Sequence, residues 1–228
     1  MRITLVFVVM IASCGVAFAV EFTFSEALGE LILSGDGKPW LSTQITPYDA
    51  ANEEETYKVF THIYDFAGEA PITKGAGGKY THHRGMFIGW NKTITREKTW
   101  DTWHMKGNHQ AHEAWLSKEA GADKAVQTEQ ISWITNDGMP LIEEARTITD
   151  TAGANGVRIF DFESTLPSKA GPIQLRGDLQ HAGMHVRMDN EVVSHEDTTH
   201  YILPEGAEEL DDDKVVGAWW VCCSPVVR

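Results

Sequence analysis

Hydrophobic and polar side chains alternate with a period of two along much of this chain, which is typical of strands with one buried face. The clearest example is the pair of segments at residues 124–135 and 139–149. Between them, Asn136-Asp137-Gly138 is a favourable hairpin turn. A third strand is predicted at residues 157–166, so this part of the chain predicts three consecutive antiparallel strands.

Shorter segments extend the same interpretation. Residues 57–66 and the apolar run Leu31-Ile32-Leu33 favour two further strands, whereas residues 109–122 are predicted to form one or two turns of helix. No long segment has apolar residues at the three-four spacing of a helix. The pattern therefore predicts an all-β fold, an antiparallel β-sandwich, as a single domain over residues 20–228.

The N-terminal residues are predicted to be a targeting segment. Arg2 precedes an apolar run at residues 3–12, and Ala17-Phe18-Ala19 offers a cleavage site before Val20, so residues 1–19 fit a secretory signal peptide. The run is shorter than the roughly 20 residues of a spanning helix. Ile11-Ala12-Ser13-Cys14 resembles a lipobox, which would instead leave a lipid anchor at Cys14. Both routes predict an exported protein, periplasmic or extracellular, with no transmembrane segment in the mature chain.

Charge and cysteine content exclude some classes of protein. The formal net charge of -14 argues against nucleic acid and anionic membrane surfaces as partners, because both require a basic surface. After cleavage at Ala19 the remaining cysteines are the adjacent Cys222 and Cys223, so no disulfide framework is predicted. Gly217-Ala218-Trp219-Trp220-Val221 before them reads as a buried strand close to the end of the chain.

Two stretches rich in histidine carry the candidate chemistry. They are residues 80–90, which contain His82, His83 and Arg84, and residues 177–187. As a strand, the second stretch places His181, His185 and Arg187 on one face and apolar side chains on the other. Imidazole titrates near neutral pH, so these residues suit acid–base chemistry. The alternative is an ordinary solvated outer face.

In the first stretch, strand geometry limits the adjacent histidines. His82 and His83 point to opposite faces of a regular strand, so only one of them would reach a given site unless a turn intervenes. The predicted catalytic residues are therefore His82 or His83 together with His181. The predicted ligand-binding residues are Arg84, His185 and Arg187.

Tryptophans and possible metal ligands lie near the same stretches. Trp90 and Trp103 flank the first stretch and suit stacking on sugar rings, although tryptophans also commonly fill a core. No metal or other cofactor is predicted. His181 and His185 would lie roughly 13 Å apart along a strand, too far to share an ion. His104, His109 and His112 are extra candidate ligands. On a helix His109 and His112 could approach each other, although surface histidines are the more common explanation.

These residues also carry a resemblance to a known family. The matching segments are Tyr57-Lys58 through Tyr64, His82-His83-Arg84-Gly85-Met86-Phe87-Ile88-Gly89-Trp90, Asp101-Thr102-Trp103 and Gly177-Asp178-Leu179-Gln180-His181-Ala182-Gly183. Over about residues 40–205 the chain resembles an exported bacterial family of unknown function often labelled "methane oxygenase PmoA". It is more distantly similar to galactose-mutarotase-like β-supersandwiches.

The resemblance implies a fold and a type of site. The mutarotase-like folds open a sugar ring with a histidine acid and a late glutamate base. By that likeness, His82 or His83 and His181 would flank the substrate, and Arg84 or Arg187 would hold a hydroxyl or a carboxylate. Family members usually continue past this chain's length, so a C-terminally truncated sandwich that lacks the late base is expected.

Together these features predict an exported protein that binds, and processes by histidine-based acid–base chemistry, a small-molecule or oligosaccharide ligand. One alternative is a noncatalytic carbohydrate-binding module. The other is a metal-dependent oxygenase-like enzyme, as the family label suggests. The membrane subunit to which that label alludes has several spanning helices, which this sequence lacks.

Overall fold

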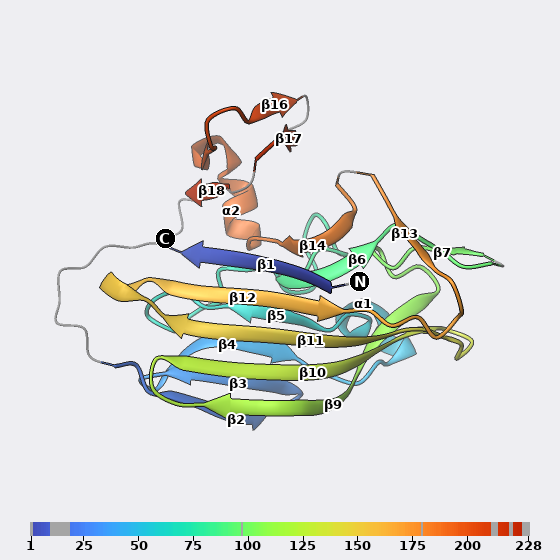
Figure 1. The fold of residues 1–228 in the computed structure, drawn as a ribbon, viewed down its shortest axis with the longest axis horizontal. Helices are drawn as coiled ribbons and strands as arrows, with labels where there is room; N and C mark the ends of the chain where they lie inside the picture. The colour runs from blue at the N-terminus through green and yellow to red at the C-terminus, as the bar shows by residue number, and fades with distance from the viewer. Residues whose placement is uncertain are drawn as a thin grey trace.

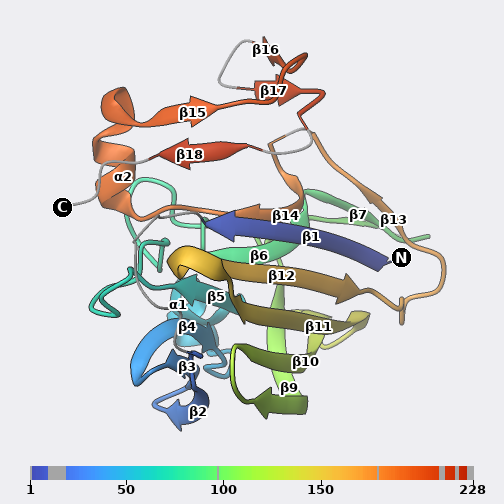
Figure 2. The same cartoon turned by 60° about the vertical axis from the view of Figure 1, so that its left-hand side comes forward.

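A computed structural model of the chain describes residues 2–9, 19–96, 98–178, 180–210, 214–218 and 221–224. Two antiparallel sheets pack face to face, so the predicted all-β sandwich is confirmed (Figure 1). In a view turned by 60°, the sheets separate into two layers, with α2, β15 and β18 beyond the β14 edge (Figure 2).

The first sheet has the strand order β1-β12-β11-β10-β9. Its members are β1 (Arg2–Val9), β9 (Asn108–Ala120), β10 (Lys124–Thr135), β11 (Pro140–Ala152) and β12 (Arg158–Thr165). The predicted hairpin is confirmed as β10 and β11, whose turn is closed by Gly138 at a φ of 88°. The strand predicted at residues 157–166 is confirmed as β12.

The second sheet has the order β14-β6-β5-β4-β3-β2. Its members are β2 (Phe22–Ala27), β3 (Glu30–Gly35), β4 (Lys38–Gln44), β5 (Phe60–Ile63), β6 (Met86–Trp90) and β14 (Ala182–Val186). The strand predicted at residues 57–66 is therefore present, but only its central part pairs. β14 joins β6 from almost a hundred residues away in the sequence and brings the second histidine stretch beside the first.

Smaller elements surround these sheets. One further sheet contains β13 (Gln174–Arg176), β7 (Lys92–Ile94) and β8 (Thr99–Trp100). β15 (His200–Ile202) pairs with β18 (Cys222–Ser224), and β16 (Glu208–Leu210) with β17 (Lys214–Val216). The helices are short: α1 (Glu53–Thr56), α2 (Asn190–Ser194), η1 (Ala50–Asn52), η2 (Ala154–Gly156) and η3 (Glu196–Thr198).

The core lies between the two main sheets. Met86 and Ile88 of β6 pack there with Trp133, Ile148 and Phe162 of the opposite sheet, all of them at most 1% exposed. This core also encloses a buried ion pair, in which Arg146 donates from Nε to Glu144 over 2.8 Å. Burial of so much apolar surface stabilises the sandwich.

The helix predicted at residues 109–122 is wrong, because this segment forms most of strand β9. Alanine, glutamate, lysine and leucine favour helix here, but pairing along β10 overrides that local preference. The inward side chains at its start are amides, Asn108 and Gln110, each 1% exposed. They hide the hydrophobic alternation that normally marks a strand.

Both ends of the chain bear on the sequence predictions. Residues 2–9, inside the predicted signal peptide, pair as β1 along β12, and cleavage remains a prediction. Trp219 and Trp220, in the strand expected near the C-terminus, lie outside the described residues. Within the described part of the chain, no helix is long and apolar enough to cross a membrane.

Candidate functional site

A second, smaller apolar cluster lies on the outer face of the six-stranded sheet. Alternation along β6 sends Met86 and Ile88 into the sandwich and Phe87 to the opposite side. Phe87 packs there with Phe60 of β5 and with Trp103, whose ring centroid is 4.7 Å from that of Phe87. Trp103 is fully buried and forms the base on which the polar side chains of the site gather.

The second histidine stretch reaches this base as its alternation predicts. His181, His185 and Arg187 all contact Trp103, at 5.7, 3.9 and 5.6 Å from its ring centroid. The intervening Ala182, Met184 and Val186 pack instead against the sandwich core. The two faces of β14 therefore divide into a polar outer face and an apolar inner face.

The first histidine stretch reaches the same site through a turn of the backbone. His82 and His83 precede β6, and the His83 amide donates to the carbonyl of Tyr80 over 3.0 Å. Because the backbone turns here, the rings of His82 and His83 do not point to opposite faces, and their centroids are 4.5 Å apart. Both predicted histidines therefore belong to one site.

His104 connects the two stretches. Its ring centroid lies 4.4 Å from that of His82 and 5.1 Å from that of His181. We call the five side chains gathered around Trp103 and His104 the histidine cluster: His82, His83, His104, His181 and His185. His104 is one of the extra candidate ligands of the sequence, and the loop between β8 and β9 brings it next to both stretches.

Two Asp-x-x-His turns orient imidazoles of the cluster. His104 Nδ1 lies 2.8 Å from Asp101 Oδ2, and His181 Nδ1 lies 2.6 Å from Asp178 Oδ1. In each turn the carboxylate also accepts a backbone N–H, from His104 in one and from Gln180 in the other. An ionised carboxylate only accepts hydrogen bonds, so Nδ1 carries the proton and Nε2 of the neutral ring is left with its lone pair.

Burial keeps several rings of the cluster neutral. It lowers the pKa of His82 to about 4 and that of His185 to about 3, and the charges of Lys58 and Arg187 act in the same direction. The pKa of His83 falls to about 2 because of burial and the charge of Arg187. Burial also lowers the pKa of His104, against the opposing effect of its hydrogen bond to Asp101.

Lys58, which the sequence reading missed, lies beneath the cluster. It is 4% exposed, and its ammonium donates to the carbonyl of His82 over 2.5 Å and lies 4.1 Å from the Phe87 ring centroid. Burial and the nearby Arg84 and Arg187 lower the pKa of Lys58 well below its usual value. A lone lysine gives no signal in a sequence, since only the fold shows that it is buried.

Arg84 has a different environment from the one expected of a ligand-binding residue. Its side chain is 1% exposed, and its guanidinium donates to the backbone carbonyls of Thr81, His83 and Glu54. These contacts favour a role in shaping the histidine turn rather than in contacting a ligand. Trp90 was also expected to bind the ligand, but it packs in the sandwich core near Trp133 instead.

Two glycines let the backbone of neighbouring segments approach this face. A Cβ on Gly85 would lie 2.4 Å from the carbonyl oxygen of Thr61, and one on Gly89 would lie 2.5 Å from that of Thr102. Any side chain at these positions would push the neighbouring strand or loop away. The glycines of the first histidine stretch therefore serve close packing of β6.

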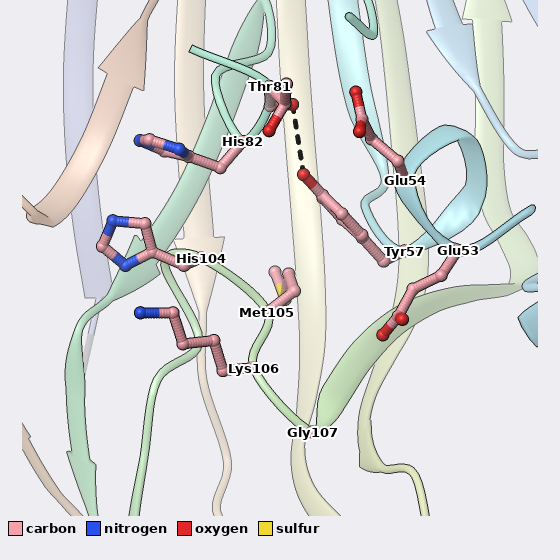
Figure 3. A pocket seen from close by; sticks show the side chains of 9 residues that line it. All are labelled: Glu53, Glu54, Tyr57, Thr81, His82, His104, Met105, Lys106 and Gly107. Carbon is pink, nitrogen blue, oxygen red and sulfur yellow. Dashed lines mark hydrogen bonds between the residues drawn. The ribbon is translucent and has the colours of Figure 1, made fainter.

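A cavity of about 420 Å³ opens beside His82 and His104. Its lining residues are Glu53, Glu54, Tyr57, Thr81, His82, His104, Met105, Lys106 and Gly107. Nitrogen-bearing side chains, His82, His104 and Lys106, line one side, and the carboxylates of Glu53 and Glu54 line the other (Figure 3). The hydroxyl of Tyr57, between them, donates to the carbonyl of Thr81 over 3.2 Å.

The other candidate histidines lie elsewhere. His109 stacks on Tyr48, and the Nδ1 of His112 lies 2.7 Å from Oε1 of Glu129. Over the described ranges, no three histidine, cysteine, aspartate or glutamate side chains are arranged to hold a metal ion.

Fold and site together define an all-β sandwich protein with a histidine-rich polar site on the outer face of one sheet. Residues 33–226 match the family of unknown function DUF6807, and the chain belongs to that family. The comparisons gave no match among curated proteins and none among solved structures.

Proposed function

We propose that the histidine cluster binds a carbohydrate and that its imidazoles act there as acid and base. The observation that carries the proposal is the pair of Asp-x-x-His turns, whose rings face each other with centroids 5.1 Å apart. Opening a sugar ring or cleaving a glycoside requires one group to remove a proton and another to deliver one. Either ring can accept a proton at its free Nε2, which makes it the base. The acid is the other ring in its imidazolium form, which carries a proton at Nε2 and is stabilised by its aspartate.

The cavity beside the cluster supports a ligand of this kind. Its volume of about 420 Å³ lies within the usual range for small-molecule sites. Glu53, Tyr57 and Lys106 line it with acceptors and donors suited to hydroxyl groups. A resemblance to mutarotase-like sandwiches points the same way, and Asp101 and Asp178 supply carboxylates that do not depend on a later part of the chain.

Export is the second part of the proposal. The sequence of residues 1–19 supports a secretory signal peptide, with cleavage before Val20. The backbone N–H of Val20 donates to Asp123 Oδ1 over 2.8 Å, so the first residue of the mature chain would already be bound to the sandwich. Export would bring the site into contact with extracellular or periplasmic sugars.

The experiment uses a chain that begins at Val20 and a panel of mono- and oligosaccharides. Binding is followed by calorimetry, and ring opening or cleavage by NMR. We expect one class of sugar to bind and to be turned over, and we expect His181→Ala to reduce turnover by about 100-fold or more. His200→Ala is the matched control, because His200 is exposed on β15 outside the cluster.

The outcomes separate the alternatives. Binding without turnover would identify a noncatalytic module, and absence of both would refute the carbohydrate proposal. Elemental analysis of the same sample tests the oxygenase alternative. A stoichiometric transition metal that is lost in His104→Ala would favour that alternative over acid–base chemistry by free imidazoles.

A further inference from the structure

Arg187, which is half-buried, differs from the buried arginines in how few hydrogen bonds its guanidinium makes. Arg84, Arg146 and Arg158 each donate to several backbone or carboxylate oxygens. Among the described residues, Arg187 makes one long hydrogen bond, 3.4 Å from Nη2 to the carbonyl of Gln180, and its buried Nε has no partner. Most of its donors are therefore available.

Lys58 is a second basic side chain without a paired carboxylate. Burial disfavours its charged form, and a bound anion would stabilise that form. Lys58 is buried against Phe87, and no ion pair within the described part of the chain includes Lys58 or Arg187. Asp101, the nearby carboxylate that acts on Lys58, is already bound by His104 and by backbone amides. Buried charges normally have a partner, because an isolated one is costly.

The side chains of Lys58 and Arg187 both lie near Trp103, whose indole N–H is a further donor. The Lys58 ammonium lies 5.8 Å and the Arg187 guanidinium 5.6 Å from the Trp103 ring centroid. The indole Nε1 of Trp103 is buried and has no hydrogen-bond acceptor among the described residues. Donors and positive charge thus collect at one point of a protein whose formal net charge is -14.

The cavity beside His82 and His104 would orient a ligand, while Arg187, Lys58 and Trp103 are not among its lining residues. His82, His104 and Lys106 form the nitrogen-bearing side of the cavity, toward the cluster, and Glu53 and Glu54 form the opposite side (Figure 3). A negatively charged group would be repelled by the carboxylates and attracted toward the cations. Hydroxyl groups at the other end of the same ligand could donate to Glu53.

We propose that the ligand of the histidine cluster is an acidic sugar, whose carboxylate or sulfate group binds Arg187 with Lys58 adding its charge from below. The inference rests on the proposed carbohydrate site and adds its substrate class. A planar guanidinium forms two parallel hydrogen bonds with a carboxylate or a sulfate, so Arg187 suits either group. The imidazoles remain the acid–base groups.

The test compares sugars that differ only in charge. Glucuronate and galacturonate methyl glycosides, the corresponding 6-sulfated sugars and the neutral parent glycosides are titrated into the chain that begins at Val20. We expect the acidic sugars to bind about tenfold or more tightly than the neutral ones, and that preference to weaken as NaCl is raised. The uronate and sulfate arms show which anion is preferred.

Variants then locate the preference. Arg187→Gln should bring the affinity ratio of acidic to neutral sugar close to one, while the matched Arg176→Gln, on exposed β13, should keep the ratio of the unaltered chain. Circular dichroism and melting show whether each variant folds. If Arg187→Gln does not fold, the salt dependence of the unaltered chain decides, since a charge contact is screened and a neutral contact is not.

Failure of this inference and failure of the carbohydrate proposal look different. Equal affinity for acidic and neutral sugars would overturn the anion preference and leave the carbohydrate site standing. If no sugar binds, inorganic sulfate is titrated in its place. Sulfate binding that is lost in Arg187→Gln would support an anion site at Arg187 and refute the carbohydrate proposal. If sulfate does not bind either, both the anion site and the carbohydrate site are overturned.

Discussion

At the scale of single residues, Asp101 and Asp178 fix the orientation of two imidazole rings in the histidine cluster. Each carboxylate holds Nδ1 of the imidazole three positions later, so that both rings present Nε2. Orientation by a hydrogen-bonded carboxylate fixes the tautomer and the position of a catalytic imidazole. The chemistry proposed for His104 and His181 depends on these two bonds.

Asp101→Asn tests this directly in the unliganded protein. The amide can present an N–H to His104 Nδ1, which would then carry the lone pair and move the ring proton to Nε2. Loss of the carboxylate also removes an interaction that raises the pKa of His104, so this pKa should fall further. Nitrogen NMR reports both changes. Asp36→Asn, in the turn between β3 and β4, is the control, and an unchanged His104 tautomer would contradict the account.

The same rings should make stability depend on pH. In the unfolded chain an imidazole binds its proton near pH 6.5, whereas burial holds the pKa of His82 at about 4 and that of His185 at about 3 in the folded protein. The unfolded state therefore binds more protons between these values, and the free energy of unfolding should fall as pH drops from 6.5 toward 4.

Urea unfolding at pH 7 and pH 5 measures this loss. His185→Gln, which does not titrate, should lose less stability between the two pH values than the unaltered chain. His200→Gln, at an exposed position, should behave like the unaltered chain. If His185→Gln and His200→Gln lose the same free energy of unfolding between pH 7 and pH 5, His185 does not cause the pH dependence.

At the scale of elements, local sequence predicted the strands that a clear turn signal bounds. It predicted β10 and β11 on either side of Asn136-Asp137-Gly138, although the inward side chains of β11 include Glu144 and Asp150. It failed for β9, where Asn108 and Gln110 point inward and where pairing with β10 decides the conformation. Hydrogen bonds from these amides to the carbonyls of Asp101 and Ile88 appear only in the folded chain.

The candidate site shows the same limit. The alternation of β14 could be read from the sequence, but the turn at His82-His83 and the burial of Lys58 could not, because both depend on distant segments. One signal was present: Asp101 and Asp178 each stand three residues before a histidine. Because the Asp-x-x-His spacing occurs twice, it could have identified Asp101, Asp178 and His104 as residues of the site.

Two buried carboxylates on the inner face of β11 allow a matched prediction. Asp150 is fully buried with no hydrogen-bond partner among the described residues, and burial, with the charge of Asp161, raises its pKa well above the usual value. Its stabilising contribution, present below pH 4, is lost as pH rises. Asp150→Asn should therefore increase the free energy of unfolding at pH 7, because the amide has no charge to bury.

Glu144→Gln is the contrast on the same face. Glu144 accepts from Trp133, Arg146 and Ser164, all of them buried. Its loss leaves the Arg146 charge without its partner and should cost about 3–5 kcal/mol. Urea unfolding at pH 7 measures both variants. Destabilisation by Asp150→Asn similar to that by Glu144→Gln would contradict the assignment of Asp150 as an unpaired acid.

At the scale of the whole molecule, the sandwich core and the site lie on opposite faces of the six-stranded sheet. Main-core residues such as Met86 and Ile88 point one way, and Phe87 and His185 point the other. This separation allows polar side chains to gather without interrupting the apolar core. Substitution of a half-buried side chain on the outer face, such as His181, should therefore change binding more than folding.

The proposed export predicts a defined mature N-terminus. Cleavage before Val20 would create an α-ammonium group where the Val20 amide now donates to Asp123 Oδ1 over 2.8 Å. The resulting ion pair is exposed and is expected to add at most about 1 kcal/mol. Mass spectrometry of the protein recovered outside the cytoplasm should give Val20 as the first residue. A lipidated chain that begins at Cys14 would establish the lipobox route instead.

The most direct test of the account is an NMR titration of the histidine signals with the best-binding sugar. We expect the ring signals of His82, His104 and His181 to shift together and saturate with one affinity, while those of His195 and His200 stay in place. Shifts confined to histidines outside the cluster, or saturable sugar binding that moves no histidine signal, would contradict it.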